Sequence, residues 1–585
     1  MTLFAGALSL NTDRLSPALK LSLRANLRSA DDQRGSWCVR EHASFFLVKW
    51  DSGAFAEPAW RASPDGSVCA LAGDPILLEN GRRLKRLEQM ERLAPELSTL
   101  QDTALAQCRG SFALVHYAAA TQTLCLSTDA LGLRSIYYVI QDGCLIFATA
   151  LRVLEAVPEV RKQLSLQGMA ELSVFSFPLA ERTPYEGLKI LRECEVLTAR
   201  TAGVNMHRYY DWSTQEDAPS QAADAAAQLH ATFREAVDAR LGQDQRVYSF
   251  LSGGMDSRAI VSTLIDRGRQ VEALNFSSTA SQDQRYALSF ATQAGSDCHL
   301  HCLPGGNFPN FSFLALAAKT ALEQNEPTSV DRPQFIWSGD GGSVGVGHVY
   351  MDERMLELGE QGDVQGAVAH FLALNRISLS SRVLTASARE QQAHLMFDRV
   401  LSEVNRYPRQ DVGRRLYLFL LFNDQRRHLF KHFETIDQHG LELLTPFFDA
   451  KLLKTVAATP TRWGVLHRLY AQLFEHLPAF ARRTPWQTYP GHQPCPLPGD
   501  PLASYQWARH VAPAPDGLKE RGQLALELLQ TFNWRMRPQV FSPAHVGLAA
   551  LLHASGLRDC RHVLQLLQLY RLHDAQTRSH QRVRS

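Results

Sequence analysis

A glycine- and serine-rich segment, Ser252-Gly253-Gly254-Met255-Asp256-Ser257, has residue types and spacing that suit phosphate chemistry. Glycine has no Cβ atom, so its backbone can approach a phosphate group closely. Ser252 and Ser257 supply hydroxyl donors, and a helix that follows would point its unpaired N–H groups at an anion. Asp256 cannot attract phosphate itself, so we expect it to hold Mg²⁺ against the phosphate oxygens. The segment predicts a loop that binds the pyrophosphate of ATP.

This loop is not a Walker A motif, because it has no G-x-x-x-x-G-K-[ST] string. Loops of the SGGxDS kind serve enzymes that release pyrophosphate and form an acyl-AMP. We therefore expect an AMP-forming ligase that makes amide bonds and requires ATP and Mg²⁺. An ordinary glycine-rich turn between a strand and a helix is the structural alternative.

The elements around this loop are expected to build a parallel sheet. Val247–Leu251 is a strand candidate, a helix is expected from about Ser257, and Val271–Phe276 is the next strand candidate. A strand–helix–strand unit of this length implies parallel strands. Ala223–Leu241 has helical periodicity, and the chain beyond residue 350 is mostly helical, for example over Val412–Thr435 and Cys560–Leu572. This half is predicted to be an α/β domain with a helical extension.

Residues 1 to about 160 have a different pattern, in which short apolar runs are bounded by turn residues. The runs are Ser44–Val48, Phe112–Tyr117, Thr123–Ser127 and Ile136–Ile140. Short strands joined by turns predict antiparallel sheets. The polar, proline-containing stretch 213–222 is typical of a linker. We therefore predict one domain over residues 1–212, a linker over 213–222 and a second domain over 223–585.

The composition excludes several classes of protein. The chain has 585 residues, 21% of them charged, and a formal net charge of +2, which gives no field that favours nucleic acid or membranes. The first residues lack the features of a signal peptide, and no apolar run is long enough to span a bilayer. The ten cysteines are scattered without paired spacing. We expect a cytoplasmic protein with free thiols.

Further motifs follow the SGGMDS segment in an order that is known from one family. They are Asp283 with Tyr286, Ser338-Gly339-Asp340-Gly341-Gly342, and Pro446-Phe447-Phe448-Asp449 with Glu442 before it. With these motifs the region resembles the synthetase domain of asparagine synthetases.

The resemblance also implies which residues surround the nucleotide. Leu251, Phe276 and Ser338 would lie near the adenosine, and Gly339 would join them in the nucleotide site.

The N-terminal half resembles the class II glutamine amidotransferase domain, an α+β antiparallel sandwich of the Ntn type. Gly110-Ser111-Phe112-Ala113 and Asp129-Ala130-Leu131-Gly132 match its G-x-F-A and D-x-x-G landmarks. Class II enzymes use an N-terminal cysteine as the nucleophile, whereas this chain has Thr2, and Cys38 is internal. The resemblance therefore implies a degenerate, catalytically silent domain without its own source of ammonia. A glutaminase that uses Thr2 is the alternative.

Without an ammonia source, the amine that attacks the acyl-AMP must come from another substrate. Two similar groups fit: lasso-peptide macrolactam synthetases and β-lactam synthetases. The long helical C-terminus and the string Thr484–His492, continuing to Pro496, favour the first.

The expected function is adenylation of an Asp or Glu side chain in a leader-cleaved precursor peptide, followed by ring closure with its N-terminal amine. The expected partners are that peptide and, as a further candidate, the leader peptidase of the pathway, with no nucleic acid and no membrane. A β-lactam or other small-molecule amide synthetase is the first alternative, and a non-catalytic nucleotide-binding homologue is the second.

The match departs from the family at the second acidic motif. Ser343 and Val344 stand where asparagine synthetases carry acids. Asp340 is therefore the candidate that joins Asp256 in holding Mg²⁺, or that acts on the attacking amine. Glu442 is the other candidate base.

The family lysine that stabilises charge around the oxyanion and phosphate has no clear counterpart. His467 and Arg468 are the candidates to replace it.

One other cluster suggests a metal site, Cys298-His299-Leu300-His301-Cys302. On a strand, the two cysteines and Leu300 would face one way and the two histidines the other. The four side chains could not converge on one zinc ion, so we predict a structural role.

Overall fold

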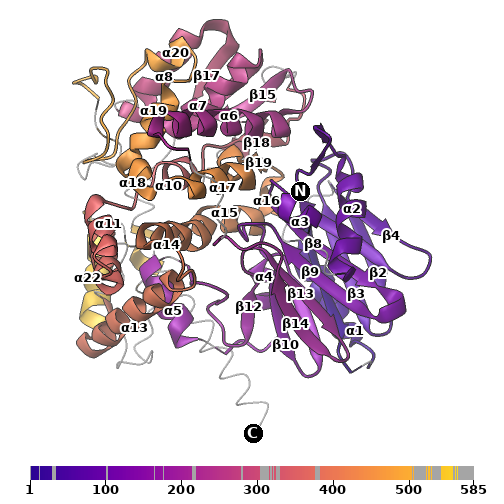
Figure 1. Cartoon of the computed structure of the whole chain (residues 1–585). Helices are drawn as coiled ribbons and strands as arrows, with labels where there is room; N and C mark the ends of the chain where they lie inside the picture. Colours follow the sequence, from indigo (N-terminus) through magenta and orange to yellow (C-terminus); the bar gives the residue numbers. More distant parts are fainter. Residues whose placement is uncertain are drawn as a thin grey trace. The chain divides into compact units, whose positions relative to one another are not determined.

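The computed structural model describes residues 2–11, 13–28, 35–99, 103–163, 165–175, 177–213, 219–277, 281–303, 315–316, 319–320, 322–323, 330–375, 383–503, 505, 522–523, 525–527, 529, 542–557, 560 and 563. The chain divides into two compact units. Figure 1 labels their helices and strands. Unit 1 contains residues 1–159, 191–353 and 420–509, and unit 2 contains residues 160–190, 354–419 and 510–585.

Two antiparallel sheets form the first part of unit 1. In the first sheet the strands lie in the order β10 (Tyr137–Gln141), β11 (Cys144–Ala148), β1 (Thr2–Ser9), β3 (Phe45–Asp51) and β2 (Ser36–Glu41). In the second the order is β14 (Gly203–Arg208), β13 (Glu195–Arg200), β9 (Thr123–Thr128), β8 (Phe112–Ala118), β5 (Val68–Gly73) and β4 (Trp60–Ala62). A short hairpin, β6 (Leu78–Glu79) and β7 (Arg82–Arg83), follows β5.

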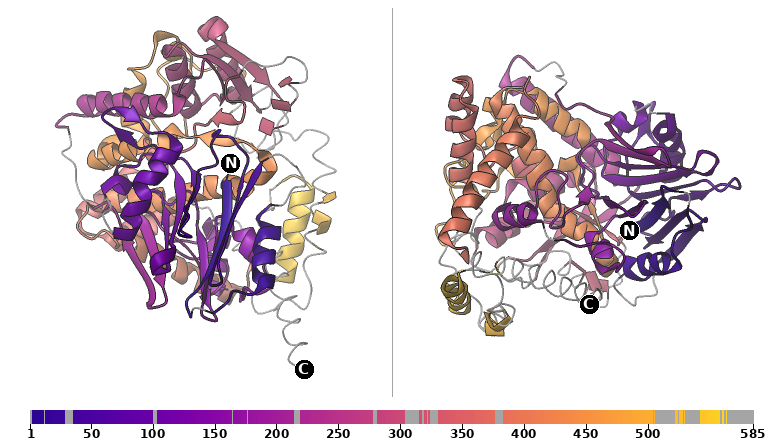
Figure 2. Two further views of the ribbon diagram at one scale, coloured as in Figure 1. Left: turned by 90° about the vertical axis from the view of Figure 1, so that its right-hand side faces the viewer. Right: turned by 90° about the horizontal axis from the view of Figure 1, so that it is seen from below.

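The two sheets share one hydrophobic core. Phe4, Phe45 and Phe147 from the first sheet and Val115 and Leu126 from the second belong to the same cluster of buried side chains. Helix α1 (Pro17–Leu27) contacts the first sheet, and α2 (Arg86–Thr99) contacts the second. This part is therefore an antiparallel sandwich with helices packed against both sheets. Its strands are the violet arrows in Figure 2.

The second part of unit 1 is a parallel sheet in the order β17 (Cys298–Cys302), β16 (Gln270–Asn275), β15 (Arg246–Phe250), β18 (Phe335–Trp337) and β19 (Glu442–Leu444). Helix α6 (Ala222–Leu241) precedes β15, α7 (Met255–Asp266) connects β15 to β16, and α8 (Gln282–Ala294) connects β16 to β17. The chain adds β16 and β17 on one side of β15 and later adds β18 and β19 on the other side. The strand order therefore reverses between β15 and β18. Ligands of open α/β sheets bind at such a switch point, outside the carboxyl ends of the strands.

Short helices complete unit 1. They are α3 (Thr103–Gln107), α4 (Leu151–Ala156), α10 (Gly342–Gly345), α15 (Gln425–Glu434), α16 (Ile436–His439), α17 (Ala450–Ala458), α18 (Thr461–Gly464), α19 (Arg468–Phe474) and α20 (Ala479–Arg482), with a π-helical turn over Leu420–Asp424.

Unit 2 is mostly helical where it is described, with one short strand, β12 (Leu188–Ile190). Its helices are α5 (Leu166–Phe175), α11 (Glu353–Glu360, from the end of unit 1), α12 (Val364–Leu374), α13 (Ala386–Val404), α14 (Val412–Phe419) and α22 (Pro543–Ala554). The Phe419 ring packs edge to face against Phe175 and Phe371. Much of the C-terminal helix predicted over 560–572 lies outside the described residues.

The predicted fold class is confirmed, with an antiparallel N-terminal part and a parallel synthetase sheet followed by helices. The predicted boundary at residues 213–222 stays a prediction. None of the helices formed by the described residues is long and apolar enough to cross a membrane.

Candidate functional site

The SGGMDS segment lies where the sequence places it, between β15 and α7, with Gly254 as the N-cap of the helix. The Ser252 amide donates to Ser257 Oγ at 2.9 Å, and the two serine hydroxyls are 2.9 Å apart. The Gly254 amide donates to Ser252 Oγ at 3.2 Å. Both serines therefore line the loop at the N-terminus of α7, where N–H groups and the helix dipole favour an anion.

Asp283, in the first turn of α8, braces this loop. Its carboxylate accepts the Gly253 amide at 2.9 Å and the Asn275 side-chain amide at 3.3 Å, and Ser277 also donates to it. Asn275 donates in turn to the Leu251 carbonyl at 2.8 Å. Burial raises the pKa of Asp283, while these donors favour its ionised form. Asp283 thus fixes the path of the loop, a role that the sequence did not specify.

The close approach of the loop to α8 requires a glycine at position 253 but not at position 254. A Cβ on Gly253 would lie 2.7 Å from Asp283 Cα, whereas a Cβ on Gly254 would meet only Ser252 Oγ at 3.4 Å. We expect Gly253→Ala to lower the melting temperature by several degrees, because overpacking costs roughly 1–3 kcal/mol. Gly254→Ala is the matched control and should melt close to the wild type. Equal melting temperatures of the two variants in a calorimetric scan would contradict the structure here.

Asp256 is the centre of a second set of contacts. Its carboxylate accepts the Ser343 amide at 3.0 Å and the Ser343 hydroxyl at 2.9 Å, and it interacts with Tyr470. A Cβ on Gly342 would lie 2.6 Å from this carboxylate, and a Cβ on Gly339 would lie 2.7 Å from the Ser257 amide. The two glycines therefore let the segment after β18 pack directly on the start of α7.

The charges at Asp256 suit a divalent cation. Burial, with a smaller contribution from the nearby charge of Asp340, raises the pKa of Asp256 to about 6, although hydrogen bonds from Ser343 and Tyr470 favour its ionised form. Asp340 is held by the Ser338 hydroxyl, which donates to it at 2.7 Å. Within the described ranges there is no cluster of three or more His, Cys, Asp or Glu side chains that could hold a metal. Two carboxylates fit Mg²⁺ bound together with ATP, because Mg²⁺ is usually held by one or two carboxylates plus substrate phosphates.

The residues predicted to contact the adenosine lie at the same edge of the sheet. Leu251 follows β15, Phe276 follows β16 and Ser338 follows β18, and all three are buried. Gly339 comes next and contacts the start of α7. The parallel register brings these positions together, and their contact with a nucleotide stays a prediction.

A strap formed by residues 484–493 passes over the phosphate loop. The Gln487 amide donates to the Gly253 carbonyl at 2.9 Å. The buried Arg258 of α7 donates to the carbonyls of Thr484 at 2.6 Å and Pro485 at 3.0 Å. The Gln493 amide donates to the Leu466 carbonyl at 2.9 Å. The proline-rich string that the sequence singled out is thus anchored at the candidate site.

His467 and Arg468, the predicted substitutes for the family lysine, do not supply a free cation. Burial lowers the pKa of His467 to about 3, with further contributions from His492 and His348, so the ring is neutral at ordinary pH. Arg468 is partly exposed and forms an ion pair with Glu353. The structure disfavours both roles, because one side chain is uncharged and the other is committed to a surface pair.

Glu442, a predicted base, lies at the wrong end of its strand for that role. It begins β19 and pairs with Phe335 at the amino end of β18. The sheet register places this level three residues before the end of β15, which is roughly 10 Å at about 3.3 Å per residue. Glu442 is buried and forms an ion pair with Arg134 of the sandwich. The geometry therefore favours a structural role for Glu442.

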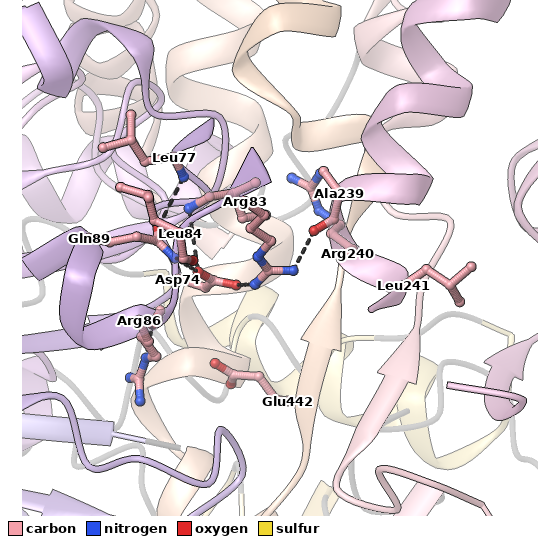
Figure 3. Close-up of polar contacts among 12 residues, drawn as sticks. Asp74, Leu77, Arg83, Leu84, Arg86, Gln89, Ala239, Arg240, Leu241 and Glu442 are labelled. Carbon is pink, nitrogen blue, oxygen red and sulfur yellow. Dashed lines mark hydrogen bonds and ion pairs between the residues drawn. The ribbon is translucent and has the colours of Figure 1, made fainter. Parts of the chain in front are cut away.

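This ion pair belongs to a set of buried charges that join the sandwich to the synthetase sheet. Segment 434–449 supplies the acids and the sandwich supplies most of the donors. The partners are Tyr137 with Glu434, Arg152 with Asp437, Arg134 with Glu442, and Arg109 with Asp449. Figure 3 shows a related contact, in which Arg83 spans from Asp74 to the Ala239 carbonyl on α6.

The Cys298–Cys302 strand has the predicted alternation. His299 and His301 both contact Glu272 on β16, at 3.3 and 2.6 Å. Arg246 pairs with the same carboxylate, and these partners lower the pKa of Glu272 to about 2 despite its desolvation. The two histidines therefore share one face of the sheet, in a polar cluster on the side away from the cysteines.

Comparisons with known proteins agree with a two-part chain of this kind. A glutamine amidotransferase domain family matches residues 78–210, and the asparagine synthase family matches residues 228–329. The chain is therefore similar to glutamine amidotransferase domains over the first of these segments and to asparagine synthases over the second.

Among curated relatives, asparagine synthetase [glutamine-hydrolyzing] 3 of Bacillus subtilis is 27% identical over 32% of this chain. Amidase chyE of Penicillium rubens is 26% identical over 33% of it. The matched regions span only 30% and 29% of these relatives.

A solved structure, glutamine phosphoribosylpyrophosphate amidotransferase of B. subtilis, aligns with 52% of this chain and 81% of its own, at 11% identity and a TM-score of 0.23. That similarity is too low to support an inference.

Proposed function

We propose that this protein is an ATP-dependent ligase that activates a carboxylate as an acyl-AMP and joins it to an amine. The observation that carries the proposal is the SGGMDS loop at the switch point of the parallel sheet, with Asp256 and Asp340 beside it. Asparagine synthetase and an amidase are among the relatives by name, and both names concern amide bonds.

In the first step a carboxylate oxygen of the substrate forms a bond to the α-phosphorus of ATP, and the bond to pyrophosphate breaks. The Ser252 and Ser257 hydroxyls and the N-terminus of α7 bind the departing pyrophosphate. Asp256 would hold Mg²⁺, which neutralises phosphate charge when bound, and Asp340 is reserved for the second step.

In the second step an amine forms a C–N bond to the acyl carbon, and the C–O bond to AMP breaks. The amine must lose a proton, and Asp340 is the carboxylate at this edge of the sheet that is placed to accept it. Asp340 is partly exposed and oriented by Ser338, whereas Glu442 is committed to Arg134.

For the substrate, we propose ring closure of a leader-free peptide through an Asp or Glu side chain and its own α-amine. The Thr484–His492 string, now seen as the strap over the loop, supports the peptide over a small molecule. Holding a flexible peptide so that both ends meet is mainly an entropic task.

The test incubates the full chain with ATP, Mg²⁺ and a synthetic peptide that has a free α-amine and one internal glutamate. Peptide-dependent release of AMP and pyrophosphate, with a product lighter by one water, would support macrolactam formation. Turnover of a small amino diacid without peptide would replace it by small-molecule amide synthesis. Binding of ATP without AMP release on any carboxylate would overturn the enzyme assignment.

A further inference from the structure

The strap places an exposed aromatic side chain next to the residues that surround the phosphate loop. Tyr489 is 41% exposed, although the strap around it is anchored at Thr484, Pro485, Gln487 and Gln493. Its hydroxyl interacts with Ser343, the residue that donates to Asp256. An exposed ring beside the phosphate loop is available to a bound substrate.

A histidine pair holds this tyrosine. His467 Nδ1 and His492 Nδ1 are 2.7 Å apart, although the two residues are 25 positions apart in the chain. The His467 ring stacks on Tyr489 with a centroid distance of 5.4 Å, and the His492 ring contacts Tyr489 at 5.6 Å. The His492 amide also donates to the Tyr489 carbonyl at 3.1 Å. Ring and backbone contacts therefore hold Tyr489 in addition to the interaction of its hydroxyl with Ser343.

The backbone at His467 is strained to make this contact. Leu466 and His467 have φ angles of 58° and 65°, in the left-handed region that residues other than glycine rarely adopt. Gly347 leaves the room for the ring, because a Cβ there would lie 2.6 Å from His467. Strain of this kind persists only where the surroundings enforce it, and it is concentrated at functional sites.

We propose that Tyr489 contacts the attacking amine of the substrate and that His467 and His492 are the residues that position it. This inference rests on the proposed function and deepens it. The amine arrives as an ammonium ion, which the face of an aromatic ring attracts. The ammonium first releases one proton to solvent, which frees the lone pair that forms the C–N bond. Asp340 takes the second proton from the nitrogen, and AMP leaves with the electrons of the broken C–O bond. Tyr489 orients the nucleophile and changes no covalent bond.

The experiment separates the two half-reactions with the same synthetic peptide. ATP–pyrophosphate exchange measures acyl-AMP formation, ring closure measures the second step, and hydroxylamine traps the acyl-AMP without needing a positioned amine. We expect Tyr489→Leu to slow ring closure at least about tenfold, the effect of losing a desolvated cation–π contact. Exchange and hydroxamate yield should stay within about twofold of the wild type, because neither acyl-AMP formation nor its trapping by hydroxylamine requires a positioned amine. Tyr489→Phe keeps the ring and should close the peptide at nearly the wild-type rate.

The positioning role has its own variants. His492→Ala should slow ring closure as Tyr489→Leu does, and His492→Asn, which keeps a hydrogen-bond partner for His467, should restore most of it. His230→Ala is the matched control, since His230 stacks on His476 in a separate histidine pair. A thermal scan verifies that each variant is folded.

Unchanged ring closure in both Tyr489→Leu and His492→Ala would overturn the inference, and so would a parallel loss of exchange. Absence of exchange in the wild type would instead overturn the proposed function.

Discussion

Replacing Asp256 by asparagine is expected to reduce AMP formation by at least about 100-fold, the scale of losing a ligand to a catalytic metal. Asp256 accepts a hydrogen bond from Ser343 and is affected by the nearby negative charge of Asp340. Asparagine has nearly the same shape, so the contacts with Ser343 are largely kept while the charge is lost. The measurement is AMP release with peptide at saturating ATP, repeated over a range of Mg²⁺ concentrations.

The matched control is Asp266→Asn at the other end of α7, where Asp266 forms a surface pair with Arg234. This variant should keep full activity. Full activity of Asp256→Asn would show that neither Mg²⁺ nor pyrophosphate depends on this carboxylate, and the proposed mechanism would then be wrong.

The second large effect concerns stability. Asp449→Ala removes a fully buried carboxylate that accepts Arg109 Nε at 3.0 Å and Arg240 Nη1 at 2.9 Å. Asp449 also caps α17 by accepting the amides of Lys451 and Leu452. Stranding buried cations costs roughly 3–5 kcal/mol and loss of an N-cap about 1 kcal/mol. Since whole domains are stable by about 5–15 kcal/mol, the variant should unfold at much lower urea concentration.

For comparison, Asp238→Ala removes a partner of Arg267 on the surface of α6. Exposed pairs contribute about 0–1 kcal/mol, so this variant should unfold with the wild type. Circular dichroism during urea titration distinguishes the two outcomes. Similar midpoints for Asp449→Ala and the wild type would mean that the buried charges do not hold the sandwich to the synthetase sheet.

Local sequence patterns were sufficient for the elements that carry the site. The predicted strands Val247–Leu251 and Val271–Phe276 correspond to β15 and β16 within one residue at each end. The predicted helix Ala223–Leu241 corresponds to α6. Apolar runs, glycines and helix caps act over a few residues, so a single sequence is enough to locate such elements.

Contacts between residues that are far apart in the sequence could not be predicted from these local patterns. Ser343 lies 87 positions from Asp256 and His492 lies 25 from His467, and no periodicity links such pairs. His467 was predicted as a cation because residue type says nothing about burial, which here removes the charge. Glu442 was predicted as a base because it is a carboxylate in a motif that resembles the family's, whereas the strand register places it toward the amino ends of the parallel strands.

The buried charges between the sandwich and the synthetase sheet have a practical consequence for engineering. The acids are concentrated in residues 434–449, and Arg109, Arg134 and Arg152 come from the other partner. Opposite charges of this kind accelerate association, and salt weakens the attraction. Two fragments cut within residues 213–222 and expressed separately are therefore suited to a split reporter whose complementation rate falls with ionic strength.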